Sequence, residues 1–137
     1  MISFEFDITP RGKGRPRFMR RGKFIRVFTD PATAKFESAI KKMAQAEMKK
    51  NKWKPMEGPL EIIMVITMPR PKSLKKSEFY APHTKKPDID NIIKGVFDPL
   101  NEVAWKDDAQ IAHVEAFKHY GDTPGIGLTI SEYANPR

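Results

Sequence analysis

The sequence contains no cysteine among its 137 residues. Disulfide bonds and zinc sites with thiolate ligands are therefore excluded. The sequence also lacks the run of roughly 20 apolar residues that a bilayer-spanning helix needs, and no apolar run at its start resembles a signal peptide. Its densest apolar segment, residues 60–68, is short and is interrupted by Glu61 and Thr67. We expect one cytoplasmic domain over residues 1–137 with no membrane contact, because a chain of this length forms one hydrophobic core.

Basic residues outnumber acidic residues by 25 to 17, which gives a formal net charge of +8. Two segments are rich in them: Arg11, Lys13, Arg15, Arg17, Arg20, Arg21, Lys23 and Arg26, with no acidic residue between them, and Arg70, Lys72, Lys75, Lys76, Lys85 and Lys86. Such segregation favours a polyanionic partner, because Lys and Arg that neutralise phosphates release bound counterions.

We therefore predict that residues 10–28 form a basic DNA-contacting loop. The candidate DNA-binding residues are Lys13, Arg15, Arg17, Lys85 and Lys86. The alternative is a solvated basic loop that only keeps the protein soluble.

Hydrophobic periodicity predicts two helices and a sheet. Asp30 and Pro31 are typical of a helix start, and that helix is expected to end near Asn51. A second helix is predicted from residue 89, and Pro99 predicts a kink or an end within residues 98–102. The expected strands are residues 2–9, 60–68, 110–120 and 126–130, with a short hairpin strand at 24–28. The predicted fold class is α/β (α+β), a single domain whose mixed or largely antiparallel sheet packs against two main helices, with residues 60–68 central.

Acidic residues concentrate between positions 88 and 108 of this otherwise basic chain. If the chain is extended at Asp88 and the helix begins directly afterwards, Asp88 and Asp90 face the same side. Lys94 lies one helical turn after Asp90, which places an ammonium group beside a carboxylate. We expect the turn that follows the helix to bring Asp107 and Asp108 back toward the helix start.

Carboxylate ligands without cysteine suit a hard cation such as Mg²⁺ better than zinc. Carboxylate-held metal ions activate water and neutralise charge during phosphodiester hydrolysis, and Lys94 would add positive charge there. Each residue also has a purely structural explanation: Asp88 as a helix cap, Asp90 as the partner of Lys94, and Asp107 and Asp108 as turn residues. Both explanations stay open from the residues alone.

Three motifs fall within residues 83–111: His83-Thr-Lys-Lys-Pro-Asp-Ile-Asp-Asn91 followed by Lys94, then Phe97-Asp-Pro-Leu-Asn101, and Lys106-Asp-Asp-Ala-Gln-Ile111. In these motifs the sequence resembles the RusA family of Holliday junction resolvases, which are crossover junction endodeoxyribonucleases. The stretch Gly12-Lys-Gly-Arg-Pro-Arg17 is similar to the basic N-terminal loop of that family. Pro99 departs from family members that have alanine at this position.

The resemblance implies a RusA-like homodimer that binds four-way branched DNA and uses Mg²⁺ to nick two opposing strands symmetrically, in DNA recombination and repair. It implies that Asp88, Asp90 and Asp108 are catalytic metal ligands and that Lys94 is a catalytic lysine. Mn²⁺ is the expected substitute for Mg²⁺, and no small-molecule cofactor is expected. Two rival functions stay open: a metal nuclease acting on flaps or forks instead of four-way junctions, and a non-catalytic basic DNA-binding protein.

Overall fold

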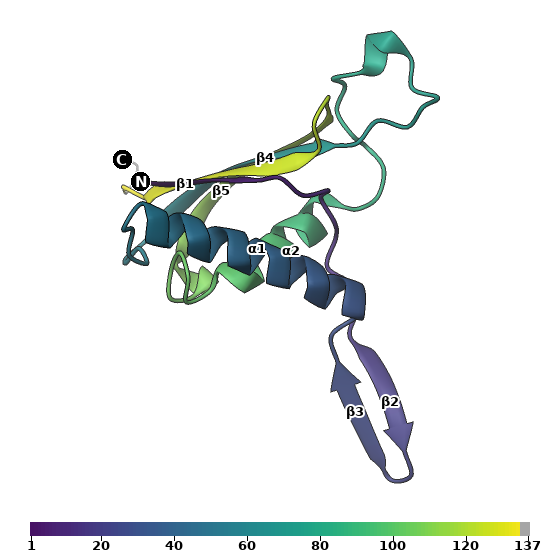
Figure 1. The fold of residues 1–137 in the computed structure, drawn as a ribbon, viewed down its shortest axis with the longest axis vertical. Coiled ribbons are helices and arrows are strands. Elements are labelled where there is room, and N and C mark those ends of the chain that lie inside the picture. Colours follow the sequence, from purple (N-terminus) through teal and green to yellow (C-terminus); the bar gives the residue numbers. More distant parts are fainter. Residues whose placement is uncertain (135–137) are drawn as a thin grey trace.

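The computed structural model describes residues 1–134 and contains a four-stranded sheet with both long helices on one face (Figure 1). The strands are β1 (Ile2–Phe6), β4 (Leu60–Met68), β5 (Ile111–Tyr120) and β6 (Gly125–Glu132), in the order β1-β6-β4-β5. β6 runs antiparallel to β1 and β4, whereas β4 and β5 are parallel. The mixed sheet and the central place of β4 confirm the predicted fold class.

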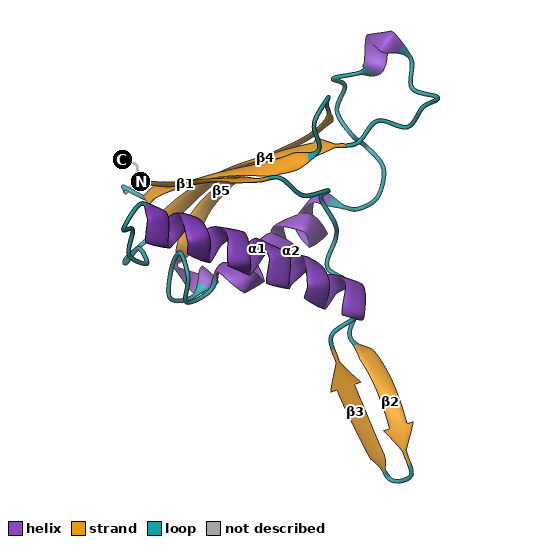
Figure 2. Cartoon of the chain, viewed as in Figure 1, coloured by secondary structure: helices purple, strands orange, loops and turns teal. Residues whose placement is uncertain are grey.

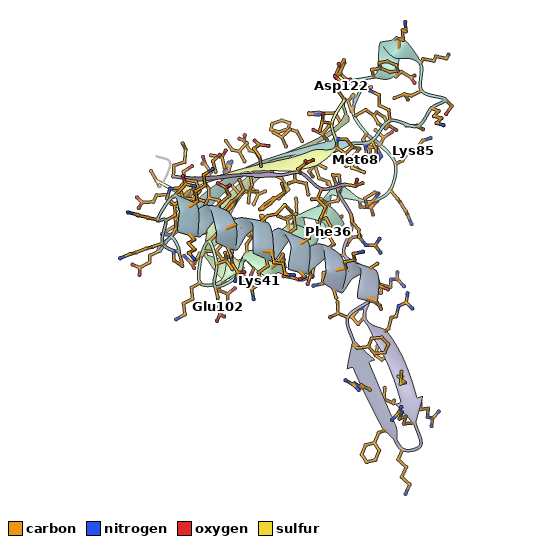
Figure 3. The ribbon with its side chains drawn as sticks, in the orientation of Figure 1. Phe36, Lys41, Met68, Lys85, Glu102 and Asp122 are labelled. Carbon is orange, nitrogen blue, oxygen red and sulfur yellow. The ribbon has the colours of Figure 1, made fainter. Side chains whose placement is uncertain are left out.

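The hydrophobic core lies between this sheet and the helices α1 (Pro31–Lys50) and α2 (Ile89–Leu100). Figure 3 shows Phe36 between α1 and the sheet, and Lys41 is exposed on the same helix. Alternate residues of β4 are buried against the helices: Leu60, Ile62, Met64, Ile66 and Met68. The opposite face of the sheet has no helix over it, and Val65 is exposed there.

The helix ends follow the predicted signals. Asp30 is the N-cap of α1, and its side chain accepts a hydrogen bond from the Thr33 N–H at 3.2 Å. α1 ends at its C-cap Asn51. Pro99 lies inside the last turn of α2, which ends at Leu100, so the expected early end is confirmed.

Two strand predictions need correction. The first strand ends at Phe6 and not at Thr9, because the Ile8 N–H turns back to donate to the Phe6 carbonyl at 3.0 Å. Residues 17–28 form a complete hairpin in place of a loop with one strand. Its strands are β2 (Arg17–Arg21) and β3 (Phe24–Phe28), and it projects away from the body of the protein (Figures 1 and 2). The sequence did not indicate β2 because its arginines hide any apolar alternation.

The remaining elements are short. η1 (Lys76–Glu78) interrupts the proline- and lysine-rich loop after β4, and η2 (Asp108–Gln110) precedes β5. No helix within residues 1–134 combines the length and the apolar character needed to cross a bilayer.

The core assignment predicts different losses for two neighbouring isoleucines. Ile62 is 0% exposed and Ile63 is 37% exposed, on opposite faces of β4. Ile62→Ala is expected to lower the free energy of unfolding by about 2–5 kcal/mol, since it leaves a cavity, whereas Ile63→Ala is expected to cost less than about 1 kcal/mol. Urea denaturation measures both values, and equal losses would contradict the assignment of the buried face.

Candidate active site

Asp88 and Asp90 lie at the start of α2 and line the same surface hollow. Asp88 is the N-cap residue and is extended, with φ −67° and ψ 147°, and α2 begins at the next residue. The chain therefore has the extended-to-helical change that was expected to turn both carboxylates to one side. The side chain of Asp88 makes no capping hydrogen bond. Capping therefore does not explain this carboxylate.

Lys94 lies one turn after Asp90, but its ammonium group is closest to a different carboxylate. Its Nζ lies 4.0 Å from Oδ2 of Asp98, one turn further along α2, and the Lys94 side chain is 63% exposed. The Asp90–Lys94 pair considered from the sequence is thus replaced by a Lys94–Asp98 pair. Ion pairs this exposed contribute little to stability, so Lys94 can turn to a ligand at small cost.

Asp108 is held at the other end of α2. Its N–H donates to the side-chain oxygen of Asn101 at 2.9 Å, and the same oxygen accepts the indole N–H of Trp105 at 2.7 Å. Asn101 is the C-cap of α2, and Trp105 is fully buried. The turn after α2 therefore returns to the end of the helix and not to its start, which corrects the sequence-based expectation.

The structure separates the roles of Asp107 and Asp108, which the sequence could not. Asp107 Oδ1 accepts from the Ala109 N–H at 3.1 Å and forms a capping box with Gln110 at the start of η2. The Ala109 N–H lowers the pKa of the Asp107 carboxyl. Burial and the neighbouring Asp107 raise the pKa of the half-buried Asp108, and the charge of Lys94 opposes this rise. Asp107 is thus a cap, and Asp108 faces the charged side of α2.

The oxygen donors at the start of α2 fit a hard divalent cation. In the part of the chain that the structure describes, no three acidic or histidine side chains are close enough together to surround a metal ion. Mg²⁺ commonly uses only one or two protein carboxylates and keeps several of its waters. Asp88 and Asp90 supply that number on one open hollow. Asp108 is not grouped with this pair.

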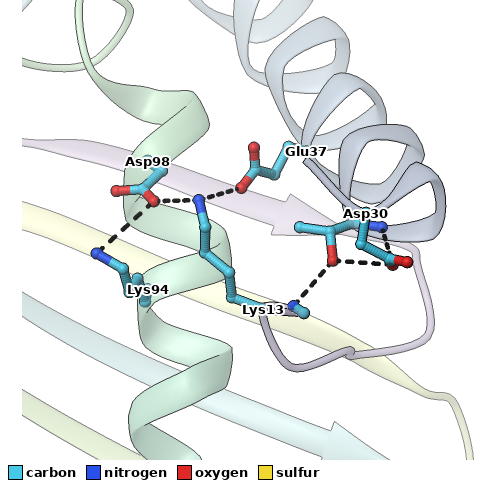
Figure 4. Close-up of polar contacts among 7 residues, drawn as sticks. Lys13, Asp30, Glu37, Lys94 and Asp98 are labelled. Atoms are coloured by element: carbon cyan, nitrogen blue, oxygen red, sulfur yellow. Dashed lines mark hydrogen bonds and ion pairs between the residues drawn. The ribbon is translucent and has the colours of Figure 1, made fainter. Parts of the chain in front are cut away.

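Lys13 forms the main polar connection around α2 (Figure 4). Its Nζ donates to Glu37 of α1 at 2.8 Å and to Asp98 of α2 at 2.5 Å, and its side chain is only 24% exposed. Burial by itself lowers the pKa of Lys13, but the two carboxylates outweigh it and raise that pKa above its usual value. Lys13 is a predicted DNA contact, and in the structure its ammonium group is bound to two carboxylates. Asp98 is one of the acidic residues between positions 88 and 108, but the sequence did not predict its ion pair with Lys13.

The other predicted DNA-contacting side chains differ in exposure and in whether they are paired with a carboxylate. Arg17 is bound to Asp30 through two nitrogens, Nε at 2.8 Å and Nη2 at 2.7 Å. The Thr33 N–H and the Arg17 guanidinium hold the pKa of the Asp30 carboxyl below its usual value. Arg15, Lys85 and Lys86 are exposed. These three therefore have the most accessible positive charges of the predicted set.

The two basic segments meet beside Asp88. A second hollow is lined by Arg11 and Lys13 from the first segment, by Lys86 from the second, and by Asp88 itself. Lys118 of β5 holds the loop directly before α2, since its Nζ donates to the carbonyls of Lys85 at 2.9 Å and Pro87 at 2.7 Å. Sequence reasoning missed this role of Lys118, because nothing in a strand pattern indicates contacts with residues 31 and 33 positions earlier.

Asn101 is predicted to be a positioning residue for Asp108. Asn101→Ala leaves the Trp105 indole N–H and the Asp108 N–H without their shared acceptor. The free energy of unfolding is expected to fall by about 1–3 kcal/mol, because unpaired buried donors lose their hydration. Asn51→Ala is the matched control, since Asn51 caps α1 through exposed bonds to Glu47, and its loss is expected to stay below about 1 kcal/mol. Equal losses in urea denaturation would contradict this role.

Comparison with known proteins agrees with the resemblance in the motifs. The sequence model of the family described as "Endodeoxyribonuclease RusA" matches residues 7–131. A protein of Bacillus subtilis (strain 168) with the name "Uncharacterized protein YqaN" is 31% identical over 141 residues, which cover 96% of each chain. The match includes both basic segments, α2 and all strands except β1 and the last residue of β6. The chain therefore belongs to the RusA family of endodeoxyribonucleases.

Proposed function

We propose that this protein is a Mg²⁺-dependent endodeoxyribonuclease that resolves Holliday junctions by paired symmetric nicks, in DNA recombination and repair. The observation that carries the proposal is the position of Asp88. Its carboxylate makes no capping hydrogen bond, and it borders both the hollow that Asp90 lines and the hollow where the two basic segments meet. Membership of the RusA family supports the same chemistry.

In this proposal Asp88 and Asp90 bind the cation. Asp108, held near the far end of α2, contributes a third carboxylate. A bound Mg²⁺, or Mn²⁺ as its substitute, would supply an activated water and neutralise charge on the scissile phosphate. Lys94 is exposed beside this site and orients toward phosphate oxygens, to which it adds positive charge. Lys118 fixes the backbone before Asp88 and so keeps the first carboxylate in place.

Arg15, Lys85 and Lys86 are the proposed contacts to the phosphate backbone, and Arg17, whose side chain is 63% exposed, adds positive charge beside them while it stays paired with Asp30. We assign Lys13 to holding the loop. A second copy of the chain completes the proposed enzyme, because two equivalent cuts at a four-way junction match the twofold symmetry of a homodimer.

Asp90→Asn is expected to lower the rate at which a synthetic four-way junction is cleaved by about 100-fold or more and to leave junction binding intact. The amide removes a charged metal ligand without changing the size of the side chain. Asp7→Asn, the same change at an exposed residue directly after β1, is the matched control. Cleavage that persists in Asp90→Asn, or in wild-type protein with chelator, would refute the site.

The same assay separates the rival functions. A flap or fork nuclease would cut those substrates faster than the junction, and a non-catalytic DNA-binding protein would bind the junction without cutting it at any Mg²⁺ concentration. Symmetric products from the junction, with linear duplex uncut, are the result expected for a resolvase.

Arg15→Gln is expected to lower the slope of log affinity against log salt by about 1 on any DNA sequence, because one phosphate contact is lost. Lys50→Gln, an equal change of charge at the far end of α1, is the control and should leave the slope unchanged. An unchanged slope for Arg15→Gln would refute its phosphate contact.

A further inference from the structure

The β2–β3 hairpin exposes apolar side chains that the fold does not use. Phe18 is 71% exposed and Phe24 is 80% exposed, and Met19, Ile25 and Val27 are exposed as well. A hairpin of two strands is at best marginally stable without a partner, and large side chains in water weaken it further. These residues therefore point to a binding partner.

The register places an aromatic ring on each face of the hairpin. Phe18 pairs with Val27 and shares its face with Ile25, whereas Phe24 pairs with Arg21 on the opposite face. A surface that docks on another protein typically presents one apolar face. A body that enters a gap between two surfaces needs apolar contacts on both faces, and the hairpin has them.

The charge of the hairpin indicates that its partner is a polyanion. Its twelve residues include five basic side chains and no acidic one: Arg17, Arg20, Arg21, Lys23 and Arg26. Two copies of such a hairpin repel each other, whereas a polyanion attracts it. Phenylalanine beside arginine is the combination that stacks on bases while holding the phosphate backbone.

The hairpin is attached firmly to the candidate active site. The Arg17–Asp30 pair fixes its base to the start of α1. The residues just before it are bound to α2, since the Lys13 N–H donates to the Asn91 carbonyl at 3.1 Å. A strand of five residues spans about 17 Å, so the tip reaches that far beyond the body. Its position is therefore set relative to Asp88 and Asp90.

We propose that the β2–β3 hairpin is a wedge that enters the branch point of a DNA junction, where Phe18 and Phe24 stack on bases left without a neighbour. This inference rests on the proposed function and goes beyond it by naming the part of the protein that distinguishes branched DNA from duplex. Linear duplex offers no open base surface, and unstacking it costs free energy that the hairpin must supply. The wedge thus favours four-way DNA.

The test compares junction and duplex binding by a Phe18→Ala/Phe24→Ala variant, in chelator so that nothing is cut. Affinity for the four-way junction is expected to fall about tenfold or more, and affinity for a linear duplex of the same length by less than about twofold. A 2-aminopurine at the branch point is expected to change its fluorescence on binding of wild-type protein and much less with the variant. Since both side chains are exposed, the melting temperature should not change.

Two further variants serve as controls at the same hairpin. Lys23→Gln removes only charge and should weaken binding to both DNAs equally. Phe18→Trp/Phe24→Trp keeps the stacking surface and should restore junction preference.

An unchanged ratio of junction to duplex affinity in the alanine variant would overturn the wedge, while cleavage by wild-type protein would still stand. A change in the mass of the protein in solution, with DNA preference unchanged, would assign the hairpin to a protein interface and overturn the wedge as well. If wild-type protein neither binds nor cuts junctions, the proposed function fails together with the wedge.

Discussion

The ion pairs of Lys13 with Glu37 and Asp98 constrain the rest of the site. They are charge-assisted and partly buried, and they join three segments that are distant in sequence: the first basic segment, α1 and α2. They add side-chain anchors to the backbone hydrogen bond from the Lys13 N–H to the Asn91 carbonyl, and so hold the glycine-rich residues before the hairpin against α2. Because Asp98 Oδ2 is occupied by Lys13, it attracts Lys94 only from 4.0 Å. One lysine thus fixes the hairpin and leaves the other lysine free.

The carboxylates at the start of α2 are, by contrast, left without the partners that the chain could supply. The sequence has 25 basic residues, yet the side chain of Asp88 does not cap its helix, and the ammonium group of Lys94 lies near Asp98 and forms no ion pair with Asp90. Elsewhere in the chain, carboxylates such as Asp30 and Asp122 are paired with arginine. Carboxylates that stay unpaired although basic side chains are available are typical of a site that binds a ligand.

Periodicity and end signals predicted both helices and all four sheet strands, because each depends on residues close in sequence. The exposed arm β2 escaped prediction because five residues with three arginines carry no burial pattern. The sequence also predicted that Asp88 is extended and that α2 begins directly after it, which turns Asp88 and Asp90 to the same side. The anchoring of Asp108 by Asn101, and of Lys13 by Asp98, did not, since these contacts depend on how the turn after α2 and the first loop pack in three dimensions.

The uncovered face of the sheet restricts where DNA can lie. The register places Glu5, Glu61 and Glu115 on this face, around Val65 and Phe117. The strand residues on this side include no lysine or arginine. A phosphate backbone would be repelled there, whereas both hollows beside Asp88 are bordered by lysines. In the proposed function, DNA therefore approaches from the side of the hairpin and the start of α2, where the two candidate metal ligands also open to solvent.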